Sequence, residues 1–130
     1  MVDLYIPKSR YTPEIQFSAS GNLSIKGMSL LEDTHQLYSE VVDWLQKFSK
    51  SSPCEVKLEL KFDHLDTSSV RSMVDIVKIM NNLGQQGFRV TINWYYEKAD
   101  EDLYETGEAI QSASKVNFIL VETQIDDFDV

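Results

Sequence analysis

Cysteine, proline and positive charge are all scarce in this chain of 130 residues. The single cysteine, Cys54, excludes a disulfide framework, and its place before an alternating apolar run predicts a small core residue. Lysine and arginine together number 12 against 21 aspartates and glutamates, which gives a formal net charge of −9. Binding to a phosphate backbone is driven by basic side chains, so the sequence argues against a nucleic-acid partner.

Long apolar runs and targeting signals are also missing. No stretch approaches the roughly 20 apolar residues of a membrane-spanning helix, and Met1–Pro7 has no basic flank followed by an apolar core. We therefore expect a soluble, cytoplasmic protein without a membrane partner. The length suits one domain, residues 1–130, with an extended lead-in over about 1–13 and an acidic, solvated tail over about 124–130.

The spacing of apolar residues divides the chain into strands and helices. Alternation predicts strands over 14–19 and 23–27, joined by a turn at 20–22, and further strands over 56–62, 88–96 and 116–123. Spacings of three and four residues predict helices from about 33 to 50 with Asp33 or Thr34 as the cap, from about 68 to 84, and from about 101 to 112, the last interrupted by Gly107.

The order of these elements is β-β-α-β-α-β-α-β, which defines an α/β fold. In the strand over 56–62, apolar residues alternate with Lys57, Glu59 and Lys61, so one face of that strand is dry and the other is wet. A strand covered by helices on both faces would instead be nearly continuous in apolar sequence. We therefore predict a two-layer domain, with a mixed sheet and its main helices on one face.

The stretch from Asp63 to Ser69 joins a strand to a helix and is rich in hydroxyl groups. Thr67, Ser68 and Ser69 are each plausible caps, because a hydroxyl oxygen can accept from the unpaired backbone N–H groups of a first helical turn. A phosphate at this position would meet the same N–H groups and the positive end of the helix dipole. Two hypotheses follow: a regulatory phosphorylation site, or a helix that is only well capped.

Enzymatic interpretations of the same stretch are weak. Asp63 and Asp66 could act as an acid and base pair, or could bind a metal together with His64, but the chain has only two histidines and no second cluster with ligand spacing. The simpler interpretation is that Asp63 and Asp66 cap the helix or face solvent. Thr67 or Ser68 as a nucleophile would need His64 as its base, and the sequence has neither a nucleophile elbow nor a Walker A loop. We expect no catalytic residue, no metal and no cofactor, and hence no enzyme.

A second notable stretch is Asn93–Glu97, which is Asn-Trp-Tyr-Tyr-Glu. Alternation points Trp94 and Tyr96 into the core and leaves Asn93 and Tyr95 on the wetter face, at a strand end that should neighbour Thr67 in a parallel sheet. Aromatic residues at a surface are favoured at protein interfaces. The stretch is therefore either a partner-binding surface or an ordinary solvated strand.

Leu65–Ser69, Asn93–Glu97 and the lead-in Thr12–Ile15 together resemble the SiaC-type regulatory phosphoprotein family over nearly the whole length. That family is similar in fold to STAS domains, the anti-sigma-factor antagonists, whose Asp-Ser-Ser-Gly stretch occupies the same junction. Val70 stands here in place of their glycine. Residues 29–32 (Ser-Leu-Leu-Glu) also differ from the Ser-Tyr-Pro-Glu expected in the SiaC family.

The resemblance implies a bacterial partner-switching protein that is not an enzyme. A dedicated GHKL-like kinase would phosphorylate it, a PP2C-type phosphatase would reverse this, and the unphosphorylated form would activate a diguanylate cyclase. The family's phosphorylated threonine corresponds to Thr67, whereas alignment with STAS domains points to Ser68. The expected partner-binding residues are Asp66, Thr67, Ser68, Ser69, Asn93 and Tyr95. The alternative is an anti-sigma-factor antagonist that binds an anti-sigma factor, or another small protein-binding module.

Overall fold

The computed structural model describes residues 1–30 and 35–124. In chain order, its elements are β1 (Leu4–Ile6), β2 (Glu14–Phe17), β3 (Asn22–Ser29), α1 (His35–Phe48), β4 (Glu55–Leu65), α2 (Thr67–Gln85), β5 (Arg89–Glu97), α3 (Glu101–Gln111) and β6 (Asn117–Thr123). The predicted helix caps Asp33 and Thr34, and residues 125–130 of the predicted acidic tail, lie outside the described residues.

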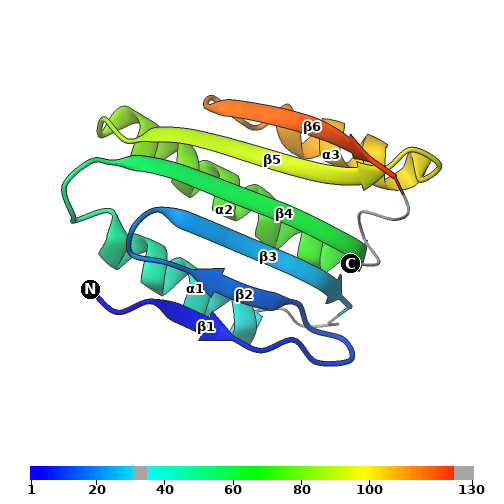
Figure 1. The fold of residues 1–130 in the computed structure, drawn as a ribbon, viewed down its shortest axis with the longest axis horizontal. Coiled ribbons are helices and arrows are strands. Elements are labelled where there is room, and N and C mark those ends of the chain that lie inside the picture. The colour runs from blue at the N-terminus through cyan, green and yellow to red at the C-terminus, as the bar shows by residue number, and fades with distance from the viewer. Residues whose placement is uncertain (31–34, 125–130) are drawn as a thin grey trace.

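The strands form one sheet whose spatial order, β1-β2-β3-β4-β5-β6, is the order of the chain (Figure 1). β2 pairs antiparallel with both β1 and β3, and the predicted hairpin joins β2 to β3. From β3 to β6 all neighbouring strands are parallel, because a helix intervenes between each strand and the next. The carboxyl ends of β3, β4, β5 and β6 therefore share one edge of the sheet.

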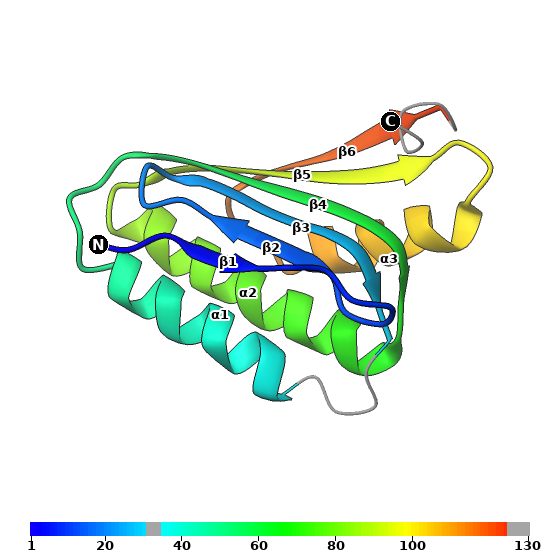
Figure 2. The same ribbon diagram turned by 60° about the horizontal axis from the view of Figure 1, so that its bottom comes forward.

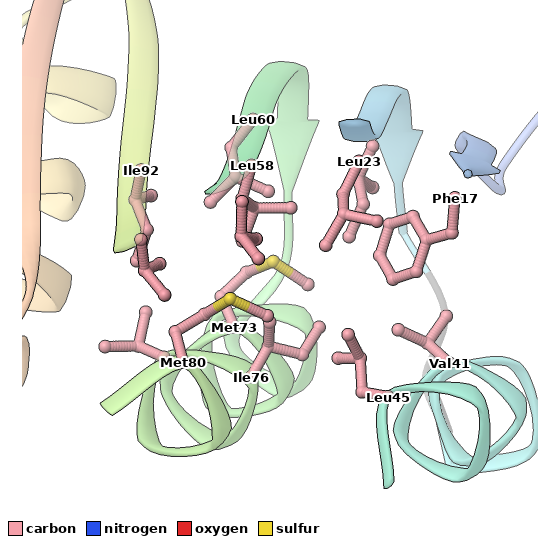
Figure 3. Close-up of a cluster of buried hydrophobic side chains, with 14 of the residues drawn as sticks. Phe17, Leu23, Val41, Leu45, Leu58, Leu60, Met73, Ile76, Met80 and Ile92 are labelled. Atoms are coloured by element: carbon pink, nitrogen blue, oxygen red, sulfur yellow. The ribbon is translucent and has the colours of Figure 1, made fainter. Parts of the chain in front are cut away.

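All three helices cover one face of the sheet and leave the other face open (Figure 2). The dry face of the central strands packs against the apolar stripes of α1 and α2 (Figure 3). The buried residues labelled there are Phe17, Leu23, Leu58, Leu60 and Ile92 from the sheet, and Val41, Leu45, Met73, Ile76 and Met80 from the helices. The predicted α/β fold, with a mixed sheet and two layers, is confirmed. No helix within the described ranges is both long enough and apolar enough to cross a membrane.

The predicted element order was wrong at its start, since Leu4–Ile6 forms a strand inside the expected lead-in. This strand pairs antiparallel with β2, where Tyr5 lies opposite Gln16. Three residues before Pro7 carry too little alternation to be recognised, and the pairing partner supplies what the local sequence does not. The observed order is thus β-β-β-α-β-α-β-α-β.

Gly107 interrupts the apolar pattern of α3 because the helix comes very close to the sheet there. A Cβ atom at position 107 would lie 2.5 Å from Cδ1 and Nε1 of Trp94 and 2.9 Å from Cδ2 of Leu120. The Trp94 indole N–H donates to the carbonyl oxygen of Leu103, at 3.1 Å, which fixes the ring against the helix. The residue that weakens the helix locally is therefore the one that lets it pack.

We predict that Gly107→Ala destabilises the domain. The gain in helix propensity is about 1 kcal/mol, but the added methyl group must displace the fixed Trp94 ring, and overpacking of this kind costs about 1–3 kcal/mol. Urea unfolding followed by circular dichroism should show a net loss of stability, whereas the exposed neighbour Glu108→Ala should change little. An unchanged or higher midpoint for Gly107→Ala would contradict the close contact.

Candidate functional site

The junction between β4 and α2 lies at the carboxyl edge of the parallel strands (Figure 1). The register between β3 and β4 shifts at one point. Gly27 pairs with Phe62 and the next residue, Met28, pairs with His64, so Asp63 is an extra residue on β4. Such a bulge bends the strand and redirects its side chains. Asp63 and His64 are both exposed as a result, and the chain then turns directly into α2.

Asp66, and not a hydroxyl residue, caps α2. Its backbone is extended (φ −87°, ψ 178°), and its Oδ1 accepts hydrogen bonds from the backbone N–H of Ser69 at 2.8 Å and from the hydroxyl of Ser68 at 3.1 Å. The interpretation of Thr67, Ser68 or Ser69 as the cap was therefore wrong, and the interpretation of Asp66 as a capping residue is confirmed. A cap needs extended backbone geometry, and Thr67 is already the first residue of the helix.

The three hydroxyl residues of the junction differ sharply in exposure. Thr67 is exposed, Ser68 is partly buried, and Ser69 is fully buried. Ser69 was expected on the partner-binding surface, but in this structure it is buried and a partner cannot reach it. Thr67 thus carries the accessible hydroxyl, at the helix terminus where backbone N–H groups lack helical partners.

Beneath the junction lies a buried cluster of three hydroxyl groups, Ser29, Tyr38 and Ser69, from β3, α1 and α2. The Ser29 Oγ lies 2.7 Å from both the Tyr38 hydroxyl oxygen and the Ser69 Oγ, and the Ser69 hydroxyl donates to the Ser29 carbonyl oxygen at 2.8 Å. All protons are used if Tyr38 donates to Ser29 and Ser29 donates to Ser69. The backbone N–H of Asp66 also donates to the Ser29 carbonyl oxygen, at 3.0 Å. The cluster therefore holds the start of α2 against β3 and α1.

The same cluster changes the acidity of its phenol. The pKa of Tyr38 is raised to about 12, mainly by burial; the hydrogen bond with Ser29 lowers it in part, and the negative charge of Asp66 contributes to the increase. The phenol stays protonated and can serve as a hydrogen-bond donor at neutral pH. Sequence reasoning missed Ser29 and Tyr38, because the hydroxyl groups of Ser29 and Ser69 meet from positions 40 residues apart.

We predict that Ser29→Ala destabilises the domain by about 1–3 kcal/mol, because Tyr38 and Ser69 would each lose a buried hydrogen-bond partner. The exposed Ser20→Ala, a chemically identical change, is the control and should cost much less. Chemical denaturation of the two variants measures the difference. Equal stability of Ser29→Ala and the unaltered chain would show that the cluster does not hold the junction.

Asn93 and Tyr95 lie on the open face of the sheet, as predicted, but not beside Thr67. Asn93 is in register with Glu59 and Tyr95 with Lys61, both well before the end of β4. The Lys61 ammonium lies 4.6 Å from the centre of the Tyr95 ring. Burial, then a hydrogen bond to Glu59 and the charge of that carboxylate, raise the pKa of Tyr95 to about 12. The structure therefore separates these two residues from the helix terminus.

The acidic residues near the junction do not form a metal site. Asp63 and His64 line a hollow of about 320 Å³ together with Glu97 and Asp100, while Asp66 is engaged in capping α2. Across residues 1–30 and 35–124, no three side chains of the metal-binding types converge on a common point. The hollow is polar and open, and we assign no chemistry to it.

The fold and the junction together define a class: two-layer α/β domains with an exposed hydroxyl at a helix terminus on the sheet edge. Comparison with known proteins identifies the class more closely. Residues 6–123 match the family model described as SiaC family regulatory phosphoprotein. The chain therefore belongs to the SiaC family of regulatory phosphoproteins.

Similar proteins come from Pseudomonas aeruginosa. An uncharacterized protein of strain UCBPP-PA14 is 31% identical over 121 residues, which cover 92% of this chain and 96% of that protein. The solved structure of SiaC of Pseudomonas aeruginosa matches this one with a TM-score of 0.86, and the two sequences are 30% identical. The match covers 95% of this chain and 100% of the SiaC chain.

The crystal structure of the diguanylate cyclase SiaD in complex with its activator SiaC also matches. Here the TM-score is 0.87 at 30% identity, over 93% of this chain and 100% of the matched chain. The comparisons thus connect the fold with regulation of a cyclase in a related protein.

Proposed function

We propose that this chain is a partner-switching regulator controlled by phosphorylation of Thr67. The observation that carries the proposal is the position of this threonine, which is exposed at the first residue of α2. Its neighbours are less suitable as acceptors. Ser69 is buried in the hydroxyl cluster, and Ser68 is partly buried with its hydroxyl bound to Asp66.

A phosphate on Thr67 would change the surface far more than the fold. It adds a charge of about −1.5 to −2 at neutral pH, next to the carboxylate of Asp66. The positive end of the α2 dipole can accommodate this charge within the domain. The buried hydroxyl cluster below the junction already satisfies its own hydrogen bonds, so it can remain in place. A partner that docks apolar or acidic groups at the junction would be repelled.

We infer that the partner released in this way is a diguanylate cyclase, which the unphosphorylated chain binds and activates without performing catalysis itself. Support comes from the related SiaC, which is the activator in the complex with SiaD. A GHKL-like kinase and a PP2C-type phosphatase, acting in the cytoplasm, complete the proposed switch. Asp66, Thr67 and Ser68 are the proposed contacts at the junction. The earlier alternative, an anti-sigma-factor antagonist, has no such support from the comparisons.

The phosphorylation site can be tested with the proposed GHKL-like kinase. Incubation with the kinase and ATP should add one phosphate to the unaltered chain and none to Thr67→Ala, as measured by intact mass and peptide mapping. The matched control Ser68→Ala should accept the phosphate normally. Transfer of the phosphate to Ser68 in the unaltered chain would overturn the assignment of Thr67.

The switch itself can be tested with the host's diguanylate cyclase. The unphosphorylated chain should raise cyclase activity, and the phosphorylated chain should bind at least about tenfold more weakly, which corresponds to about 1.4 kcal/mol. Thr67→Val keeps the shape of the side chain but cannot be phosphorylated, so it should activate the cyclase even after kinase treatment. Equal binding of both forms would rule out release by phosphorylation.

A further inference from the structure

A continuous row of side chains crosses the open face of the sheet from one edge strand to the other. Each member is in register with the next, through all six strands. The row consists of Tyr5, Gln16, Ser24, Glu59, Asn93 and Ile119. None of the helices α1, α2 and α3 that the structure describes covers this face (Figure 2), so these side chains form its surface.

A groove of about 460 Å³ lies along the part of this row that runs from β1 to β4. Ser24 is a small residue between the longer Gln16 and Glu59, which accounts for the hollow. Tyr5 lines the groove at the sheet edge, and its side chain is 57% exposed. The groove therefore has a polar middle and an aromatic end.

The Glu59 carboxylate in this groove has an unsatisfied oxygen. Tyr95 forms a hydrogen bond with this carboxylate, but the Glu59 Oε2 is buried and has no hydrogen-bond partner among residues 1–30 and 35–124. Lys57 and Lys61 flank Glu59 on the same face of β4. Lys57 lines the groove, and the Lys61 ammonium lies over the ring of Tyr95. The other carboxylate in the groove, Asp3, already accepts from the backbone N–H of Ala19, at 2.8 Å. A buried charged oxygen without a partner is costly, so Glu59 is poised to accept a donor from outside the chain.

We propose that this groove is a docking site for an arginine side chain carried by a protein partner. The guanidinium group would donate to the Glu59 Oε2, and its planar face would pack on the exposed ring of Tyr5. Arginine fits better than lysine, because its flat group can bond a carboxylate and stack on an aromatic ring at the same time. Asp3 and Glu59 outnumber Lys57, the one cation among the lining residues, and the chain as a whole carries a net charge of −9.

The shape of the groove favours a protein over a small molecule. Sites for small ligands enclose most of the ligand surface, whereas this groove lies on the uncovered face of a sheet. A protein partner brings its own surface to exclude water around a central charged contact. The partner would cover the central row of the sheet, including Asn93, which gives the Asn-Trp-Tyr-Tyr-Glu stretch a role separate from Thr67.

The site can be tested by NMR on the full, isotopically labelled chain. The probe is the tripeptide acetyl-Gly-Arg-Gly-amide, and its counterpart contains citrulline, which has nearly the same shape but no charge. The arginine peptide should shift the amide signals of Ser24, Glu59 and Asn93 in a saturable manner, and citrulline should not. Glu59→Gln should weaken the arginine peptide about tenfold, because a charge-assisted bond becomes a neutral one.

The matched control is Glu55→Gln, which changes an exposed carboxylate on the same face of β4 and should leave binding unaltered. Urea unfolding adds an independent readout, since Glu59→Gln should be at least as stable as the unaltered chain. Equal binding of the arginine peptide to Glu59→Gln, or shifts scattered over the acidic surface, would overturn the proposal. So would a loss of stability in Glu59→Gln, which would show that the Oε2 atom already has a partner within the chain.

Discussion

Burial of only one face of the sheet is the constraint on which the other features of this protein depend. Along β4, Leu58 and Leu60 are buried under the helices, while Glu59 and Lys61, which alternate with them, point to the open face. Because the three helices share one side, the parallel strands end at a common edge where each chain segment must turn toward the helical layer. The molecule consequently offers two distinct surfaces, an edge and an open face, and they differ in chemistry.

The alternation that encodes this one-sided burial was readable in the sequence and predicted the layers and the strands from β2 to β6, while spacings of three and four residues predicted the helices. What it could not show were features that depend on a partner distant in sequence. The strand Leu4–Ile6 exists because β2 lies beside it, and three residues carry no period of their own. Glycine has a low helix propensity, so Gly107 made the helix over 101–112 less certain. The structure needs a glycine there because Trp94 leaves no room for a Cβ atom, and no local sequence pattern reveals that contact.

The junction between β4 and α2 was located along the chain by sequence reasoning, but its detail was not. Alternation and hydroxyl content identified the junction at Thr67, whereas the choice of cap depends on which residue keeps extended backbone geometry, and that residue is Asp66. The burial of Ser69 depends on its contact with Ser29. Asn93 was expected beside the helix terminus from the parallel arrangement alone, but the register sets it opposite Glu59. Strand register depends on contacts between segments that are distant in the sequence. The hydrophobic period fixes which face a side chain is on, but not which residue of the neighbouring strand it lies beside.

Rigidity at the junction determines how a modification there can act. The start of α2 is held to β3 by the Asp66 N–H and to β3 and α1 by the buried hydroxyls, so an added phosphate meets a fixed surface. A fixed surface favours switching by charge, since local refolding would require these satisfied hydrogen bonds to break. Glu59 lies on the same strand but on the face that the helices leave uncovered. A protein of this design can therefore alter one surface by phosphorylation while the contact chemistry of the other stays unchanged.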